Sequence, residues 1–130
     1  MGQQQLLLII LGVIVVGIAV AVGITMFQDN AVSANRDAVT NDLVNLASRA
    51  QQYYRRPTAL GGGQGDFDGL NMNRLTSKPV NANGSYTLVT GAAQAAQIDG
   101  YGTEDGNDGT NPIHLEMHVD ADSTWIVEQN

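Results

Sequence analysis

The feature that most constrains this chain is an unbroken apolar run near its start. From Leu6 to Phe27 the sequence reads LLLIILGVIVVGIAVAVGITMF, without a charged side chain. As a helix the run would be about 33 Å long, close to the thickness of a bilayer's hydrocarbon core. The six basic and 13 acidic residues all lie at Asp29 or beyond. The sequence therefore predicts a lipid-compatible helix in residues 1–28 and a water-facing region after it.

The residues around this run favour a retained helix over a secretory signal that is removed. A removable signal has a basic start, a shorter apolar stretch and a small-residue cleavage site after it. Here the chain begins Met1-Gly2-Gln3-Gln4-Gln5, and it passes from Phe27 directly into a helical pattern.

Residues 29–57 carry the pattern of an amphipathic helix. Their apolar residues recur at steps of seven, four, three, four and three, which marks one helical stripe; they are Val32, Val39, Leu43, Leu46, Ala50 and Tyr53. No proline or glycine separates this stripe from the apolar run, and Pro57 disfavours helix at Arg56. We expect one continuous helix of about 50 residues.

Residues 58–130 predict a glycine-rich loop followed by a small antiparallel sheet. Thr58 to Gly69 holds five of the 15 glycines and reads as a loop around Phe67. Asn83-Gly84 is a turn signal that leads into a strand over Ser85–Val89, and a short strand is expected over Gln97–Tyr101.

The clearest strand signal runs from Ile113 to Val119, where apolar and polar residues alternate without error. Turn residues at 120–123 and a strand over Thr124–Glu128 complete a hairpin. We expect the stripe of the helix to cover the apolar face of the sheet. We call the amphipathic helix together with the sheet that it covers the α+β head. The residues expected to pack in its core are Val39, Leu43, Leu46, Leu115, Met117 and Trp125, with Val127 beside Trp125.

This order of elements resembles the type IV pilins and the pseudopilins of type II secretion, and the resemblance covers the whole chain. The family usually has phenylalanine or methionine first, glutamate at the fifth mature position and often a proline within the apolar segment. Here Met1 fits, Gln5 stands at the fifth position and the segment contains no proline. If a short leader ended at Gly2, the mature chain would begin at Gln3 and Leu7 would be fifth. Both starts remain open.

The resemblance implies that the apolar helix forms the core of a filament. Gln5 cannot form the ion pair of the family's glutamate, but its amide can still donate and accept hydrogen bonds. Glycines along the helix either permit close helix contact or let the helix stretch on assembly. The residues assigned to this core are Gln5, Leu6, Ile10, Gly12, Val15, Gly17, Val20 and Gly23.

The resemblance also implies a function, a location and a set of partners. The expected function is that of a major pilin-like subunit, which polymerises into an extracellular filament for adhesion, motility or surface contact. Alternatives are a pseudopilin of a type II secretion or DNA-uptake machine, and a single-pass membrane-anchored binding module. The expected partners are further copies of the chain, the inner membrane before assembly and the pilus assembly machinery.

The composition argues against several other functions. A net charge of −7 and a pI near 4.4 disfavour direct binding to nucleic acid. The chain has no cysteine, and no recognisable set of nucleophile, base and orienting group, so neither an enzyme nor a cofactor is expected.

Two groups of polar residues have side chains of the kinds that bind metal ions. In the acidic segment 104–111, Asp105, Asn107 and Asp108 could bind calcium, although an ordinary solvated turn is favoured. His114 and His118 would lie on one side of a strand about 13 Å apart, too far for one ion, so they read as surface histidines.

Overall fold

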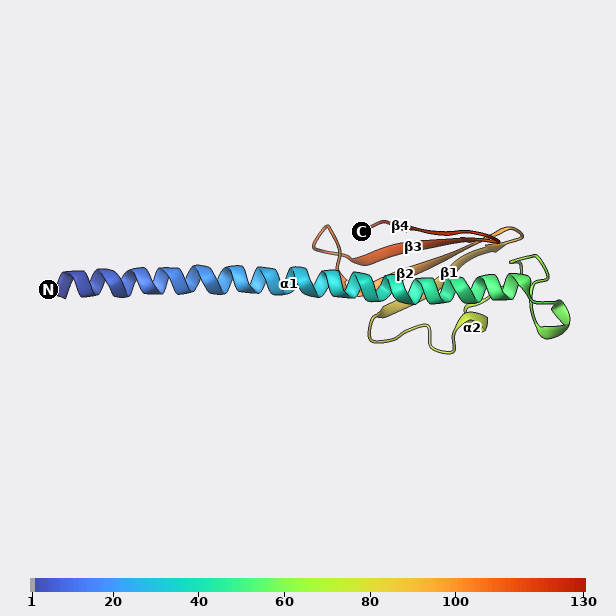
Figure 1. The fold of residues 1–130 in the computed structure, drawn as a ribbon, viewed down its shortest axis with the longest axis horizontal. Coiled ribbons are helices and arrows are strands. Elements are labelled where there is room, and N and C mark those ends of the chain that lie inside the picture. Colours follow the sequence, from blue (N-terminus) through green and yellow to red (C-terminus); the bar gives the residue numbers. More distant parts are fainter. Residues whose placement is uncertain (1) are drawn as a thin grey trace. The chain divides into compact units, whose positions relative to one another are not determined.

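The computed structural model describes residues 2–130, so Met1, the residue that fits the family's usual start, lies outside the described residues. The chain consists of two compact units, residues 1–33 and residues 34–130. The elements follow the order α1 (Gly2–Arg55), a 3₁₀ turn (Thr58–Leu60), α2 (Met72–Leu75), β1 (Gly84–Ala92), β2 (Ala95–Asp105), β3 (Pro112–Asp120) and β4 (Thr124–Glu128) (Figure 1).

The helix α1 is continuous from Gly2 to Arg55 and ends two residues before Pro57, which confirms the predicted single helix. It passes through three glycines without a break. The large apolar side chains from Leu6 to Phe27 are each more than half exposed. Among residues 2–130, α1 is the one helix long and apolar enough to cross a membrane.

In the second unit the four strands form one antiparallel sheet in the order β1-β2-β3-β4 (Figure 1). The predicted hairpin of the last two strands is confirmed, with Met117 opposite Ile126. The strand expected over Gln97–Tyr101 is longer than predicted, because β2 extends from Ala95 to Asp105. Its register against β3 shifts between Tyr101 and Asp105, and the amides of Thr103 and Glu104 donate there to Oδ1 of Asn35 on α1.

The core of this unit lies between the helical stripe and one face of the sheet. On α1 the buried residues are Val39, Leu43, Leu46, Ala47 and Ala50. On β3 they are Ile113, Leu115, Met117 and Val119, the four apolar positions of the alternating pattern. The two surfaces meet at Gly100, where an added Cβ would lie 3.0 Å from Cγ1 of Val39 and 3.1 Å from Cδ1 of Leu43. The structure thus confirms the α+β class and helix-on-sheet packing.

The expectation that Trp125 and Val127 face this core is wrong. Trp125 is 47% exposed and Val127 is 37% exposed. The β3–β4 register pairs Trp125 with His118 and Val127 with Glu116, so both lie on the outward face of the sheet. Ile126, opposite buried Met117, takes the inward position instead.

The glycine-rich loop is held by the aromatic anchor that the sequence indicated. Phe67 is fully buried, and its ring centroid lies 4.7 Å from that of Tyr54 on α1. Its amide donates to the carbonyl of Ala93 in the β1–β2 turn. The loop therefore closes the sheet at the end where α1 stops.

Candidate functional site

The residues assigned to a filament core all lie in the first unit, on the exposed surface of α1. Gln5, Leu6, Ile10, Val15 and Val20 are exposed. Around Gly12, Gly17 and Gly23 an added Cβ would meet nothing within 4 Å. This surface offers apolar area and small-residue gaps to another helix or to lipid. Its role in assembly remains a prediction.

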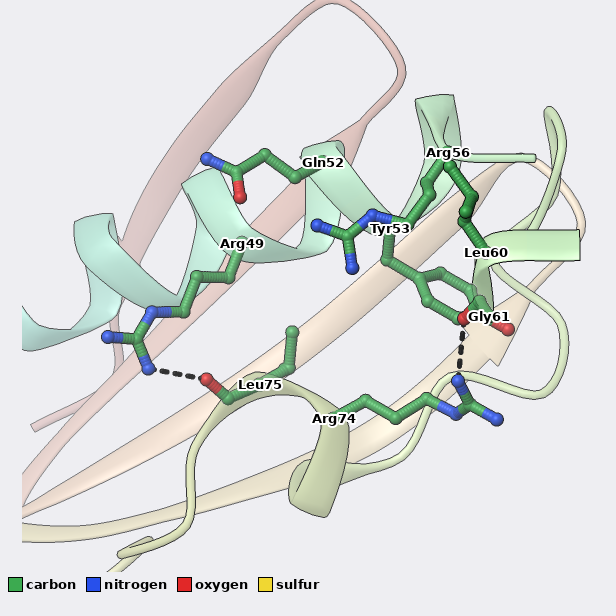
Figure 2. Close-up of a pocket in the computed structure, with 8 residues that line it drawn as sticks. All are labelled: Arg49, Gln52, Tyr53, Arg56, Leu60, Gly61, Arg74 and Leu75. Carbon is green, nitrogen blue, oxygen red and sulfur yellow. Dashed lines mark hydrogen bonds between the residues drawn. The ribbon is translucent and has the colours of Figure 1, made fainter. Parts of the chain in front are cut away.

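An open cavity of about 480 Å³ lies where α1 ends, between the helix and the segment that carries α2 (Figure 2). Arg49, Arg56 and Arg74 line it together with Tyr53. Two of the guanidiniums donate to carbonyl groups, Arg49 to Leu75 and Arg74 to Gly61, each at 2.6 Å. Within residues 2–130 none of the three arginines forms an ion pair. The cavity can therefore accept a carboxylate or another anion.

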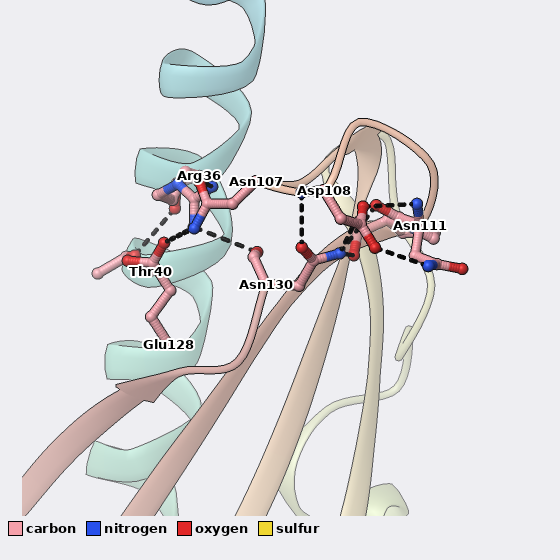
Figure 3. A network of polar contacts seen from close by, with 8 residues as sticks. Arg36, Thr40, Asn107, Asp108, Asn111, Glu128 and Asn130 are labelled. Atoms are coloured by element: carbon pink, nitrogen blue, oxygen red, sulfur yellow. Dashed lines mark hydrogen bonds and ion pairs between the residues drawn. The ribbon is translucent and has the colours of Figure 1, made fainter.

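The acidic loop between β2 and β3 is tied to α1 and to the chain's last residues rather than arranged around an ion (Figure 3). Oδ1 of Asn107 accepts a hydrogen bond from Arg36, a cation that would oppose bound calcium. The Arg36 guanidinium also pairs with Glu128 at 2.5 Å.

The carboxylate of Asp108 likewise accepts hydrogen bonds from within the turn. The donors are the amides of Asn111 and Thr110 and the side chain of Asn111. These hydrogen bonds hold the pKa of Asp108 well below its usual range, and the bond from the backbone amide of Asn111 has the largest effect. The structure thus gives two of the calcium candidates, Asn107 and Asp108, other partners, and Asp105 ends β2 opposite Pro112.

The outward face of the sheet carries a cluster that sequence reasoning missed. Asp99 on β2 lies directly opposite Glu116 on β3. Nε2 of His114 is 3.3 Å from Oδ2 of Asp99, and one ligand atom from each of Asp99, His114 and Glu116 lies within 4.8 Å of the others. Asp99 is only 8% exposed, although it is a carboxylate. Among the described residues these three side chains could hold a metal ion.

The two histidines therefore behave differently from the prediction of simple surface residues. They do lie on one face, but each contacts a carboxylate: His114 contacts Asp99, and Nε2 of His118 is 3.5 Å from Glu116. The alternation of histidine and glutamate in β3 was visible in the sequence. The missing information was the register that brings Asp99 next to them.

Comparison of the chain with protein-family models, with characterised proteins and with solved structures finds no match.

Proposed function

We propose that this chain is the structural subunit of a type IV pilus-like filament, held in a membrane by the first part of α1 before assembly. The observation that carries the proposal is the continuity of α1. A single helix supplies both an exposed, uncharged apolar surface and the stripe on which the head folds. A filament core made of such helices would bury the apolar part while the head stays in water.

The apolar surface of α1 suits both the membrane-inserted chain and the assembled fibre. In a bilayer, lipid already solvates the side chains from Leu6 to Phe27, so helix association depends on close packing and hydrogen bonds. In water, separating two such helices exposes large apolar side chains at about 1.5 to 3 kcal/mol each. A fibre built this way is stable outside the membrane.

We further propose that neighbouring heads contact each other through opposite charges. The arginine cavity lies near Arg49 and Arg56, whereas the amide of Glu104 is bonded to Asn35, about 20 Å or more back along the helix. Glu104 and Asp105 are exposed at that other end of the head. Two different, complementary patches on one subunit give a heterologous contact, which extends into a fibre instead of closing.

Electron microscopy of material sheared from cells that express the chain tests the function. We expect long fibres that label with an antibody to the head and that disappear when the gene is deleted. The control is a chain with one substitution: the Asn41→Asp variant adds a charge at an exposed position of the second unit. It should leave the fibres intact.

The same experiment separates the alternatives. Short fibres seen only when the chain is overproduced would favour a pseudopilin of a secretion or DNA-uptake machine. A chain that stays in the membrane fraction, with no fibres at any level of expression, would exclude the filament and favour an anchored binding module.

A further inference from the structure

The cluster on the outward face of the sheet contains an electrostatic conflict. Asp99 and Glu116 face each other directly across β2 and β3, and like charges in this position destabilise a sheet. Within residues 2–130 neither carboxylate has a lysine or arginine partner. When both imidazoles are neutral, the cluster carries two uncompensated negative charges, one of them on a buried residue. Such a site favours a cation.

The positions of the ligand atoms fit one small ion. Zinc with nitrogen and oxygen ligands at about 2.0 to 2.1 Å in a tetrahedron has neighbouring ligand atoms about 3.3 to 3.4 Å apart. Oδ2 of Asp99 and Nε2 of His114 already have this spacing, at 3.3 Å. One oxygen of Glu116 lies within 4.8 Å of one ligand atom of Asp99 and one of His114. A rotation of the Glu116 side chain that moves this oxygen by up to about 1.4 Å gives it the spacing of a tetrahedral shell.

Two of the three side chains, Asp99 and His114, are held in place by a neighbour outside the set. Nε2 of Gln97 donates to Oδ1 of Asp99 at 3.0 Å, which leaves Oδ2 for an ion. The His114 ring stacks on Tyr101 with centroids 4.4 Å apart. A hydrogen-bonding outer partner such as Gln97 orients a metal ligand and raises the affinity of a site.

We propose that Asp99, His114 and Glu116 form a binding site for a divalent transition-metal ion of the zinc type. An imidazole nitrogen with two carboxylates suits zinc better than calcium, which takes six to eight oxygen ligands in most sites. The side chains of His114 and Glu116 are 23% and 21% exposed, so an ion can enter from solvent and keep water as a further ligand. The ion joins β2 to β3 and removes the repulsion between them.

The chain contains its own reporter of this site. Trp125, its only tryptophan, stacks on His118 with ring centroids 5.3 Å apart. Nε2 of His118 is in turn 3.5 Å from Glu116. Movement of Glu116 onto an ion therefore changes the surroundings of the indole, and its fluorescence should respond.

The test is a titration of the full, untagged chain in detergent with Zn²⁺ alone, followed by calorimetry and by Trp125 fluorescence. We expect saturable binding of one ion per chain, a matching fluorescence change and a rise in Tm. Ca²⁺ and Mg²⁺ should give no such response at the same concentrations. Absence of saturable Zn²⁺ binding to the folded chain would overturn the site.

Near-isosteric variants test the ligand set. Asp99→Asn, Glu116→Gln and His114→Gln should each weaken binding by at least tenfold, because even outer partners of metal ligands contribute roughly 10- to 100-fold. The matched control is Glu104→Gln, an exposed carboxylate of β2, which should bind with nearly unchanged affinity. His118→Gln, which removes only a contact to Glu116, should weaken binding less than His114→Gln does. All affinities are measured by calorimetry. Equal losses in His114→Gln and His118→Gln would contradict this ligand set.

A stability measurement separates a metal site from a merely structural cluster. Without metal, Glu116→Gln should have a Tm equal to or above that of the parent chain, since it removes one of the two facing charges. With Zn²⁺ it should lose the rise in Tm. A variant whose Tm falls equally with and without Zn²⁺ would show that Glu116 acts through other contacts, and the proposal would fail.

Discussion

The hydroxyl of Tyr86 on β1 donates a 2.5 Å hydrogen bond to Oδ2 of Asp42 on α1, and this bond joins the edge of the sheet to the helix that covers it. The side chains of Asn81 and Asn83 donate to the same oxygen at 3.1 Å. Burial on its own would raise the pKa of Asp42, but the three hydrogen bonds, led by Tyr86, outweigh it and lower that pKa. Burial and the neighbouring Asp42 raise the pKa of Tyr86.

Asp42 should make the stability of the head depend on pH. Because its pKa is lowered by folding, its contribution is present at neutral pH and is lost as the pH falls below about 4. Asp42→Asn should reduce the free energy of unfolding at pH 7 by about 1.5 to 3 kcal/mol and flatten the decline in acid. Urea unfolding of the full chain in detergent between pH 7 and 3 measures both effects. Tyr86→Phe should share the flattening, whereas Tyr101→Phe should not.

Leu43 should be essential for the stability of the head. It is fully buried, so Leu43→Asp places an unpaired carboxylate in the core and should lower the free energy of unfolding by roughly 3 kcal/mol or more. Val44, the next residue, is 48% exposed, and Val44→Asp is the control. Near-UV circular dichroism during thermal unfolding distinguishes them. Equal Tm values for the two variants would contradict the helix-on-sheet packing.

Any side chain at Gly100 should lower the stability of the head, because this position lies at the helix–sheet contact. An alanine Cβ there would lie 3.0 to 3.2 Å from side-chain atoms of Val39, Leu43 and Tyr86. Gly100→Ala should cost about 1 to 3 kcal/mol of stability through overpacking. Gly23→Ala, at a helix position with open space, should leave the unfolding of the head unchanged. A Gly100→Ala chain as stable as its parent would show that the contact is looser than described.

The proposed fibre should depend on the apolar helix more than on Gln5. Gln5→Ala should weaken assembly mildly, whereas Val15→Asp should abolish membrane insertion or polymerisation, because a carboxylate at mid-helix costs about 2.5 to 3.5 kcal/mol on insertion. Fibres should survive about 1 M salt, since screening acts on exposed charges. Quantifying sheared fibres measures each case. Fibres that dissolve in that salt but tolerate Val15→Asp would reverse this account.

The charge contact between heads should respond to charge reversal. Arg56→Glu should reduce the yield of fibres, and adding Glu104→Lys in the same chain should restore part of it. Arg55→Glu is the control, because Arg55 does not line the cavity. Fibre yields that are equal for Arg55→Glu and Arg56→Glu would argue against a specific contact.

Much of the fold was readable because it depends on local patterns. The spacing from Val39 to Ala50 indicated the helix stripe, Pro57 its end, and the alternation from Ile113 to Val119 a strand with one buried face. These signals are periodicities of 3.6 and 2 residues, which a sequence displays directly. Trp125 was misplaced because Thr124–Glu128 has apolar residues on both faces, so periodicity alone could not choose between them.

By itself, the sequence determined that the chain has an uncharged apolar helix, an amphipathic continuation and an alternating C-terminal hairpin, since each follows from neighbouring residues. Only the tertiary structure decided the register of the sheet. That register turns Trp125 outward, sets Asp99 opposite Glu116 and brings His114 to the same point. The physical reason is that register is fixed by the turns and bulges between consecutive strands and by packing against α1, which is far away in the chain. A shift of one residue would move every side chain of a strand to the other face.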